Sequence, residues 1–152
     1  SNCETQIEVA KEAARQSTGV NLPFFLEPIT YGKVADMDRA GTVIKTVEMI
    51  LEGGVKPDVF KLQYPGSPEA CATISEILNA VEIPWILLTG GENFELFRER
   101  LQTAVSYGAV GFLAGRAIWQ EIADCPDEAS RMKFLSDIAK KRFKEVCEIA
   151  GQ

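Results

Sequence analysis

Apolar residues recur with helical spacing in several segments of the chain, and most of these segments end near a glycine. The first, residues 4–16, carries apolar positions every three or four residues and is followed by Gly19, a helix stop signal. Further helices are predicted over residues 36–52, 67–80, 93–107 and about 128–149, with short helical turns near residues 118–122. Ser67 and Asn93 are suited to be N-caps, because their side-chain oxygens can accept hydrogen bonds from free backbone N–H groups.

Four short apolar runs lie between these helices, over residues 22–29, 57–64, 84–88 and 110–114. They are nearly continuous rather than alternating, which is typical of parallel strands covered by helices. Successive runs are about 25 to 35 residues apart, the size of a βα unit. The pattern predicts a single α/β domain over residues 1–152, with one helix followed by four βα units. A doubly wound sheet and half of a (βα)8 barrel both satisfy this pattern; a complete barrel needs roughly 250 residues.

Lys61 interrupts the second apolar run. Removing an ammonium group from water costs several kcal/mol, so a lysine in a buried strand should point into a polar cavity or lose its charge. An uncharged lysine can attack a carbonyl carbon and form a Schiff base. The alternative is a lysine near the strand end whose ammonium group reaches solvent.

Side chains alternate between the two faces of a strand, and this alternation relates Lys61 to Glu27. If Phe60 and Leu62 face the helices, Lys61 faces the other way, and Glu27 in the first run does so as well. Both side chains would then lie near the C-terminal ends of adjacent strands, where barrel enzymes carry out their chemistry. A structural ion pair is the alternative interpretation of these two residues.

Composition narrows the possible chemistry. The net charge of -6 argues against non-specific nucleic-acid binding, and no apolar run approaches the roughly 20 residues that cross a bilayer. The four cysteines are far apart in the sequence, which predicts reduced thiols in a cytoplasmic protein and no zinc site. There is no histidine, so catalysis would depend on lysine, carboxylate, tyrosine or backbone groups.

Glycine-containing loops follow the third and fourth runs. Gly90 and Gly91 end one run, and Gly115 and Arg116 end the next. Glycine lets backbone N–H groups approach an anion, and an arginine can bind a phosphate with two hydrogen bonds. A glycine after a strand is often only a turn, but two such loops in successive units favour a phosphate site.

Four segments together resemble a known enzyme family. They are LPFFLEP at residues 22–28, DVFKL at 58–62, IPWILLTGG at 83–91 and GFLAGRAIW at 111–119. In this order they resemble the C-terminal half of the class I aldolases related to tagatose-1,6-bisphosphate aldolase, of which the sulfofructose-phosphate aldolases are close relatives. The resemblance covers nearly the whole chain, from the helix before barrel strand 5 to the last helix.

The resemblance implies aldol cleavage or condensation of a phosphorylated ketose. Lys61 would form the Schiff base, Glu27 would transfer protons, and Gly90, Gly91, Gly115 and Arg116 would hold a substrate phosphate. No metal or other cofactor is implied.

The resemblance also has two departures. Gln63 stands where relatives often have an acidic residue, and the family's strands 1–4, with a second active-site lysine, have no counterpart here. We therefore expect the isolated chain to be inactive and to form a homo-oligomer or pair with an N-terminal half. A phosphosugar-binding half-barrel without turnover is the first alternative. A doubly wound regulatory module, in which Lys61 and Glu27 form a structural pair, is the second.

Overall fold

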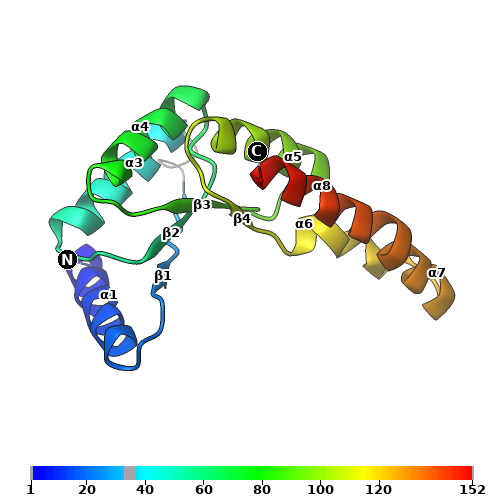
Figure 1. Ribbon diagram of the computed structural model, residues 1–152, viewed down its shortest axis with the longest axis horizontal. Coiled ribbons are helices and arrows are strands. Elements are labelled where there is room, and N and C mark those ends of the chain that lie inside the picture. Colours follow the sequence, from blue (N-terminus) through cyan, green and yellow to red (C-terminus); the bar gives the residue numbers. More distant parts are fainter. Residues whose placement is uncertain (1, 33–36, 152) are drawn as a thin grey trace.

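A four-stranded parallel sheet organises the protein, as a computed structural model that describes residues 2–32 and 37–151 shows (Figure 1). The strands are β1 (Phe25–Leu26), β2 (Val59–Leu62), β3 (Trp85–Leu88) and β4 (Phe112–Leu113), and they lie in the order β1-β2-β3-β4. A doubly wound sheet reverses its strand order at a switch point, whereas a barrel keeps the order of the chain. The structure therefore confirms the predicted α/β class with four parallel βα units, and it agrees with half of a (βα)8 barrel.

Helices alternate with the strands along the chain. They are α1 (Asn2–Gly19), α3 (Arg39–Glu52), α4 (Pro68–Asn79), α5 (Phe94–Ser106), α6 (Arg116–Trp119), a 3-10 helix (Gln120–Asp124), α7 (Glu128–Lys133), a π-helical segment (Phe134–Ala139) and α8 (Lys140–Ala150). Figure 1 shows α3, α4, α5 and α8 on one side of the sheet, with α7 at the far end of the molecule. In the part of the chain that the structure describes, no helix is long and apolar enough to span a membrane.

The predicted N-caps are confirmed where the structure tests them. The side chain of Ser67 accepts a hydrogen bond from the backbone N–H of Ala70 at 3.2 Å, and that of Asn93 accepts one from Leu96 at 3.0 Å. Each bond satisfies an N–H that the first helical turn leaves without a partner. The predicted start of the second helix at residue 36 lies outside the described residues, and helix α3 is capped by Asp38 instead.

Two elements differ most from their predicted form, while β2 and β4 are also shorter than predicted. The first strand is much shorter than residues 22–29, since Pro23 and Pro28 on either side of β1 lack the N–H that a sheet ladder needs. The last predicted helix is interrupted by the π-helical segment. In a π turn, residues five apart lie on one face, and this spacing lets both Phe134 and Ala139 be buried, at 9% and 7% exposure.

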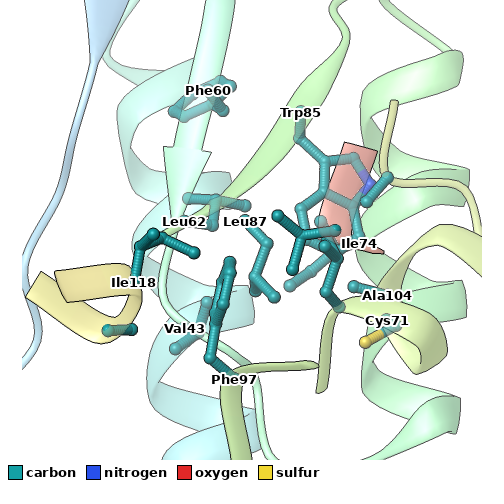
Figure 2. Packing of buried hydrophobic residues seen from close by; sticks show 14 of the residues in the cluster. Val43, Phe60, Leu62, Cys71, Ile74, Trp85, Leu87, Phe97, Ala104 and Ile118 are labelled. Carbon is teal, nitrogen blue, oxygen red and sulfur yellow. The ribbon is translucent and has the colours of Figure 1, made fainter. Parts of the chain in front are cut away.

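The core lies between the sheet and the helices. Phe60, Leu62 and Leu87 project from β2 and β3 toward Val43, Ile74 and Phe97 of the helices, as Figure 2 shows. Phe60 and Leu62 are almost fully buried, while their neighbours Val59 and Lys61 are only partly buried. The alternation predicted for β2 is therefore confirmed: its apolar side faces the helices and Lys61 faces the opposite side of the sheet.

The opposite side of the sheet is partly exposed. Phe25 of β1 and Leu113 of β4 lie on the same side as Lys61, according to the strand register, and are 49% and 47% exposed. In a closed barrel this side forms the packed interior. The polar residues of the candidate site lie at the C-terminal edge of this side.

Candidate functional site

Glu27 and Lys61 form an ion pair at the C-terminal ends of β1 and β2. Leu26 pairs with Phe60 in parallel register, and the next residue on each strand is Glu27 and Lys61. The Lys61 Nζ atom donates a hydrogen bond to Glu27 Oε2 at 2.6 Å, with side-chain exposures of 22% and 40%. The prediction that these two side chains share one face is confirmed. Their catalytic roles stay predictions.

Two side chains that flank β2, those of Asp58 and Gln63, fix the register that brings this pair together. Asp58 Oδ2 accepts a hydrogen bond from the backbone N–H of Phe24 at 2.6 Å, just before β1. Beyond the pair, Gln63 Oε1 accepts hydrogen bonds from the backbone N–H and the hydroxyl of Thr30, both at 2.8 Å. The ion pair is thus held between two side-chain contacts that join the same two chain segments.

Gln63 has a structural role that the sequence did not reveal. The only indication in the sequence was its position two residues after Lys61, which places both side chains on the same face of the strand. Its partner Thr30 is 33 residues away, and only the fold brings the two together. The contact uses the oxygen of the amide, so the missing acidic group does not leave Thr30 without an acceptor.

Gly90 and Gly91 form a tight turn directly after β3. Their φ angles are +62° and +81°, and the backbone N–H of Glu92 donates to the carbonyl of Thr89 at 3.1 Å. Two successive left-handed residues are typical of a type I′ turn and favour glycine at both positions.

Arg116 of the second loop approaches this turn. A Cβ atom added at Gly91 would lie 3.9 Å from the Arg116 Nη2 atom, so the guanidinium group stands close to the Gly91 backbone. Gly115 precedes Arg116 as the N-cap residue of α6, and a Cβ there would meet no atom within 4 Å. The structure therefore brings Gly91 and Arg116 together and leaves open space at Gly115. Phosphate binding by these residues stays a prediction.

Arg142 of α8 fixes the short helix that begins with Arg116. Its guanidinium group donates to both carboxylate oxygens of Glu121, at 2.8 and 2.7 Å, and to the Ile118 carbonyl at 3.3 Å. It also lies over the ring of Phe94, 4.9 Å from the centroid. No sequence pattern indicated this cluster, because Arg142 is 21 residues from Glu121 and its periodicity places it only on a long amphipathic helix.

A polar pocket of about 230 Å³ opens beside the glycine turn. Its polar lining comes from Arg39, Gln63, Tyr64, Gly90, Glu92 and Arg100. Arg100 forms an ion pair with Glu92 and lies over the Tyr64 ring, 5.0 Å from the centroid. Burial lowers the pKa of Arg100, and the nearby positive charge of Arg39 lowers it as well.

A larger cavity, of about 620 Å³, lies between α1, β1 and α3. Its lining is mostly apolar and includes Ile7, Leu26 and Met49, and it reaches Glu27 but not Lys61. We place the candidate site at the strand ends, since the polar and charged groups gather there. Among the described residues, no three Cys, Asp or Glu side chains are grouped as a metal site would require.

The contact between Arg142 and Glu121 predicts a pH-dependent contribution to stability. Hydrogen bonding to Arg142 lowers the pKa of Glu121 below its ordinary value of 4.5. A carboxyl whose pKa is lower in the folded protein stabilises the fold above the ordinary value and loses that contribution as the pH falls through the lowered one. Replacing Arg142 with Met should therefore reduce the free energy of unfolding more at pH 7 than at pH 3, as measured by denaturant titration.

The single replacement Glu121→Gln provides the control. When Glu121 is already glutamine, replacing Arg142 with Met should change the free energy of unfolding by the same amount at pH 7 and at pH 3. An Arg142→Met effect of equal size at pH 7 and pH 3 would show that the ion pair contributes nothing and that Arg142 acts only through its contacts with Ile118 and Phe94.

The amino-acid sequence is similar to that of one family of known proteins. Residues 2–121 match the DeoC/LacD family aldolase model. The chain is 30% identical to tagatose 1,6-diphosphate aldolase of Listeria monocytogenes serotype 4a over 128 aligned positions, covering 67% of this chain and 38% of the relative. It is 27% identical to tagatose 1,6-diphosphate aldolase 2 of Streptococcus agalactiae serotype III over 162 positions, covering 87% of this chain and 49% of the relative. The chain thus spans less than half the length of either relative.

Because the family model covers most of its residues, the chain belongs to the DeoC/LacD aldolase family.

Proposed function

We propose that this protein is a Schiff-base aldolase that cleaves and forms a carbon–carbon bond in a phosphorylated ketose, with Lys61 as the nucleophile. The observation that carries the proposal is the contact between Lys61 Nζ and Glu27 Oε2, 2.6 Å long, at the C-terminal ends of adjacent parallel strands. In a chain of this family, a lysine in contact with a proton acceptor at that edge has the chemistry that a Schiff-base reaction needs.

The proposed reaction begins with proton transfer. Glu27 accepts a proton from the Lys61 ammonium group, and the neutral amine attacks the ketone carbon of the substrate. Glu27 returns that proton to the hydroxyl that leaves as water, and a protonated imine results that withdraws electrons from the neighbouring carbon. The bond between the α and β carbons then breaks: the β-hydroxyl gives its proton to the Glu27 carboxylate, an aldehyde leaves, and an enamine remains on Lys61. Glu27 then protonates the enamine carbon, and addition of water to the imine releases the second product and restores the Lys61 ammonium group and the Glu27 carboxylate.

The glycine turn and Arg116 supply the proposed phosphate site. The backbone of Gly90 and Gly91 is free of side chains, and the Arg116 guanidinium group stands beside Gly91. A phosphate held by Gly90, Gly91, Gly115 and Arg116 would lie beyond the ends of β3 and β4, at the same edge of the sheet as Lys61. Fixing the phosphate in this way would orient the ketone toward the amine. The names of the relatives support a tagatose 1,6-diphosphate-like ketose as the substrate.

A second function is supported by the extent of the match. The chain covers 38% of the Listeria relative and 49% of the Streptococcus one. If groups from the rest of such a protein are needed for turnover, this chain by itself would bind a phosphorylated sugar without cleaving it. Binding without imine formation is therefore the alternative that the first experiment must separate.

Chemical trapping tests the nucleophile. Borohydride reduces an imine to a stable secondary amine, so the full-length protein incubated with dihydroxyacetone phosphate and borohydride should gain one reduced triose phosphate at Lys61. Mass spectrometry of the peptides would locate the adduct. Replacing Lys61 with Met should abolish it.

Lys56 offers a matched control, because it is an exposed lysine shortly before the same strand. Replacing it with Met should leave the adduct unchanged. An unmodified wild-type protein, or an adduct that persists in the Lys61→Met variant, would refute the Schiff-base proposal; stabilisation by the ligand without an adduct would favour the binding-only alternative.

We further propose that the exposed side of the sheet is covered by another protein surface, either four further βα units or a second copy of the chain. Phe25 and Leu113 are about half exposed there, and β1 and β4 are the edge strands of the sheet. Exposed apolar side chains and unpaired strand edges both promote association.

The 152-residue chain studied alone should therefore self-associate in light scattering at micromolar concentration. Replacing Leu113 with Glu should shift the distribution toward monomer, because a charge cannot be buried at low cost in an apolar interface. The same replacement at Val9, which is 66% exposed on α1, should have little effect. A wild-type chain that is strictly monomeric under these conditions would contradict the proposal.

A further inference from the structure

Glu92 places a carboxylate group against the turn that the proposed function assigns to phosphate binding. Its Oε1 atom lies 3.6 Å from the position that a Cβ at Gly90 would occupy, and its backbone N–H closes the turn by bonding to Thr89. The side chain is only 24% exposed. A negative charge therefore stands beside the backbone that is proposed to receive a negatively charged ligand.

This arrangement would weaken phosphate binding if the carboxylate were left alone. Two negative charges a few ångströms apart repel each other strongly where water screens them poorly, as in a partly buried site. A phosphate carries up to two charges at neutral pH, which increases the repulsion.

Arg100 of α5 compensates for this carboxylate. Its Nη1 atom forms an ion pair with Glu92 Oε1, the same oxygen that lies over Gly90. Arg100 is itself only 29% exposed, and its guanidinium group is stacked over the Tyr64 ring. Arg100 is thus positioned by helix α5 and by the Tyr64 ring, and it contacts the Glu92 carboxylate oxygen that lies near Gly90.

A second arginine lines the same polar pocket. Arg39 lies in the first turn of α3, and its positive charge lowers the pKa of Arg100. Arg116 stands beside Gly91 of the same turn.

We propose that Arg100 is a positioning residue that sets the anion affinity of the Gly90–Gly91 turn by neutralising Glu92 and holding it in place. The inference depends on the proposed phosphate role of this turn. It assigns to Arg100 an effect on ligand binding through Glu92, without direct contact between Arg100 and the phosphate.

Calorimetric titration of inorganic phosphate into the full-length protein tests the proposal. Four forms are compared: wild type, Arg100→Met, Glu92→Gln, and the double variant. Loss of Arg100 alone should weaken phosphate binding by about tenfold, within a range of roughly 3- to 100-fold for one uncompensated charge at this separation. Glu92→Gln should bind at least as tightly as wild type. The double variant should return to within about threefold of wild type, since the charge that needs compensation is gone.

Arg98 provides the matched control on the same helix. It pairs with Glu95 and Glu145 and does not line the pocket. Arg98→Met removes the same charge from the protein and should leave the phosphate affinity unchanged. The effect of Arg100→Met should also shrink at high ionic strength, because salt screens the repulsion that it exposes.

The outcomes separate this inference from the proposed function. If wild type binds phosphate, Arg116→Met weakens that binding, and Arg100→Met has no effect, the phosphate turn stands and the inference about Arg100 is overturned. Weak binding in Arg100→Met that the double variant fails to restore also overturns it, since Arg100 would then act as a structural support. If wild type does not bind phosphate, the phosphate turn itself is refuted and the inference falls with it.

Discussion

The parallel register between β1 and β2 is the constraint on which the candidate site depends. This register aligns Leu26 with Phe60, and as a direct consequence Glu27 lies opposite Lys61. A shift of one residue would turn one of the two side chains to the helix-covered face of the sheet. The strand β1 itself has only two residues, so its own ladder is too short to secure the alignment. The contacts of Asp58 with Phe24 and of Gln63 with Thr30 secure it from both ends.

The same sheet explains why polar chemistry gathers where it does. One face of β2 is buried against the helices by Phe60 and Leu62, and that burial fixes the direction of every other side chain on the strand. The parallel arrangement then places all four strand ends at one edge. At this edge the strands end, and glycines begin the loops after β3 and β4. The ion pair, the glycine turn and Arg116 are therefore products of one topology, although they come from four separate segments of the chain.

What could be predicted from the sequence was the part that depends on local periodicity. The strand alternation placed Glu27 and Lys61 on one face, and the order of helices and strands indicated parallel βα units. The roles of Gln63, Arg100 and Arg142 could not be predicted in this way. Their partners Thr30, Glu92 and Glu121 lie on other segments, and only side-chain packing in three dimensions selects them. The π-helical segment was also not predicted, because residues 128–149 as a whole have the periodicity of one amphipathic helix.

The coupling between Lys61 and Glu27 tests the account most directly. Lys61→Met, Glu27→Gln and the double variant form a double-mutant cycle in the free energy of unfolding. The side chains are partly exposed, so solvent screening limits the coupling, and we expect about 0.5 kcal/mol, decreasing as salt is added. A coupling of zero at low salt would contradict a stabilising ion pair between Lys61 and Glu27, and with it the contact on which the proposed site is built.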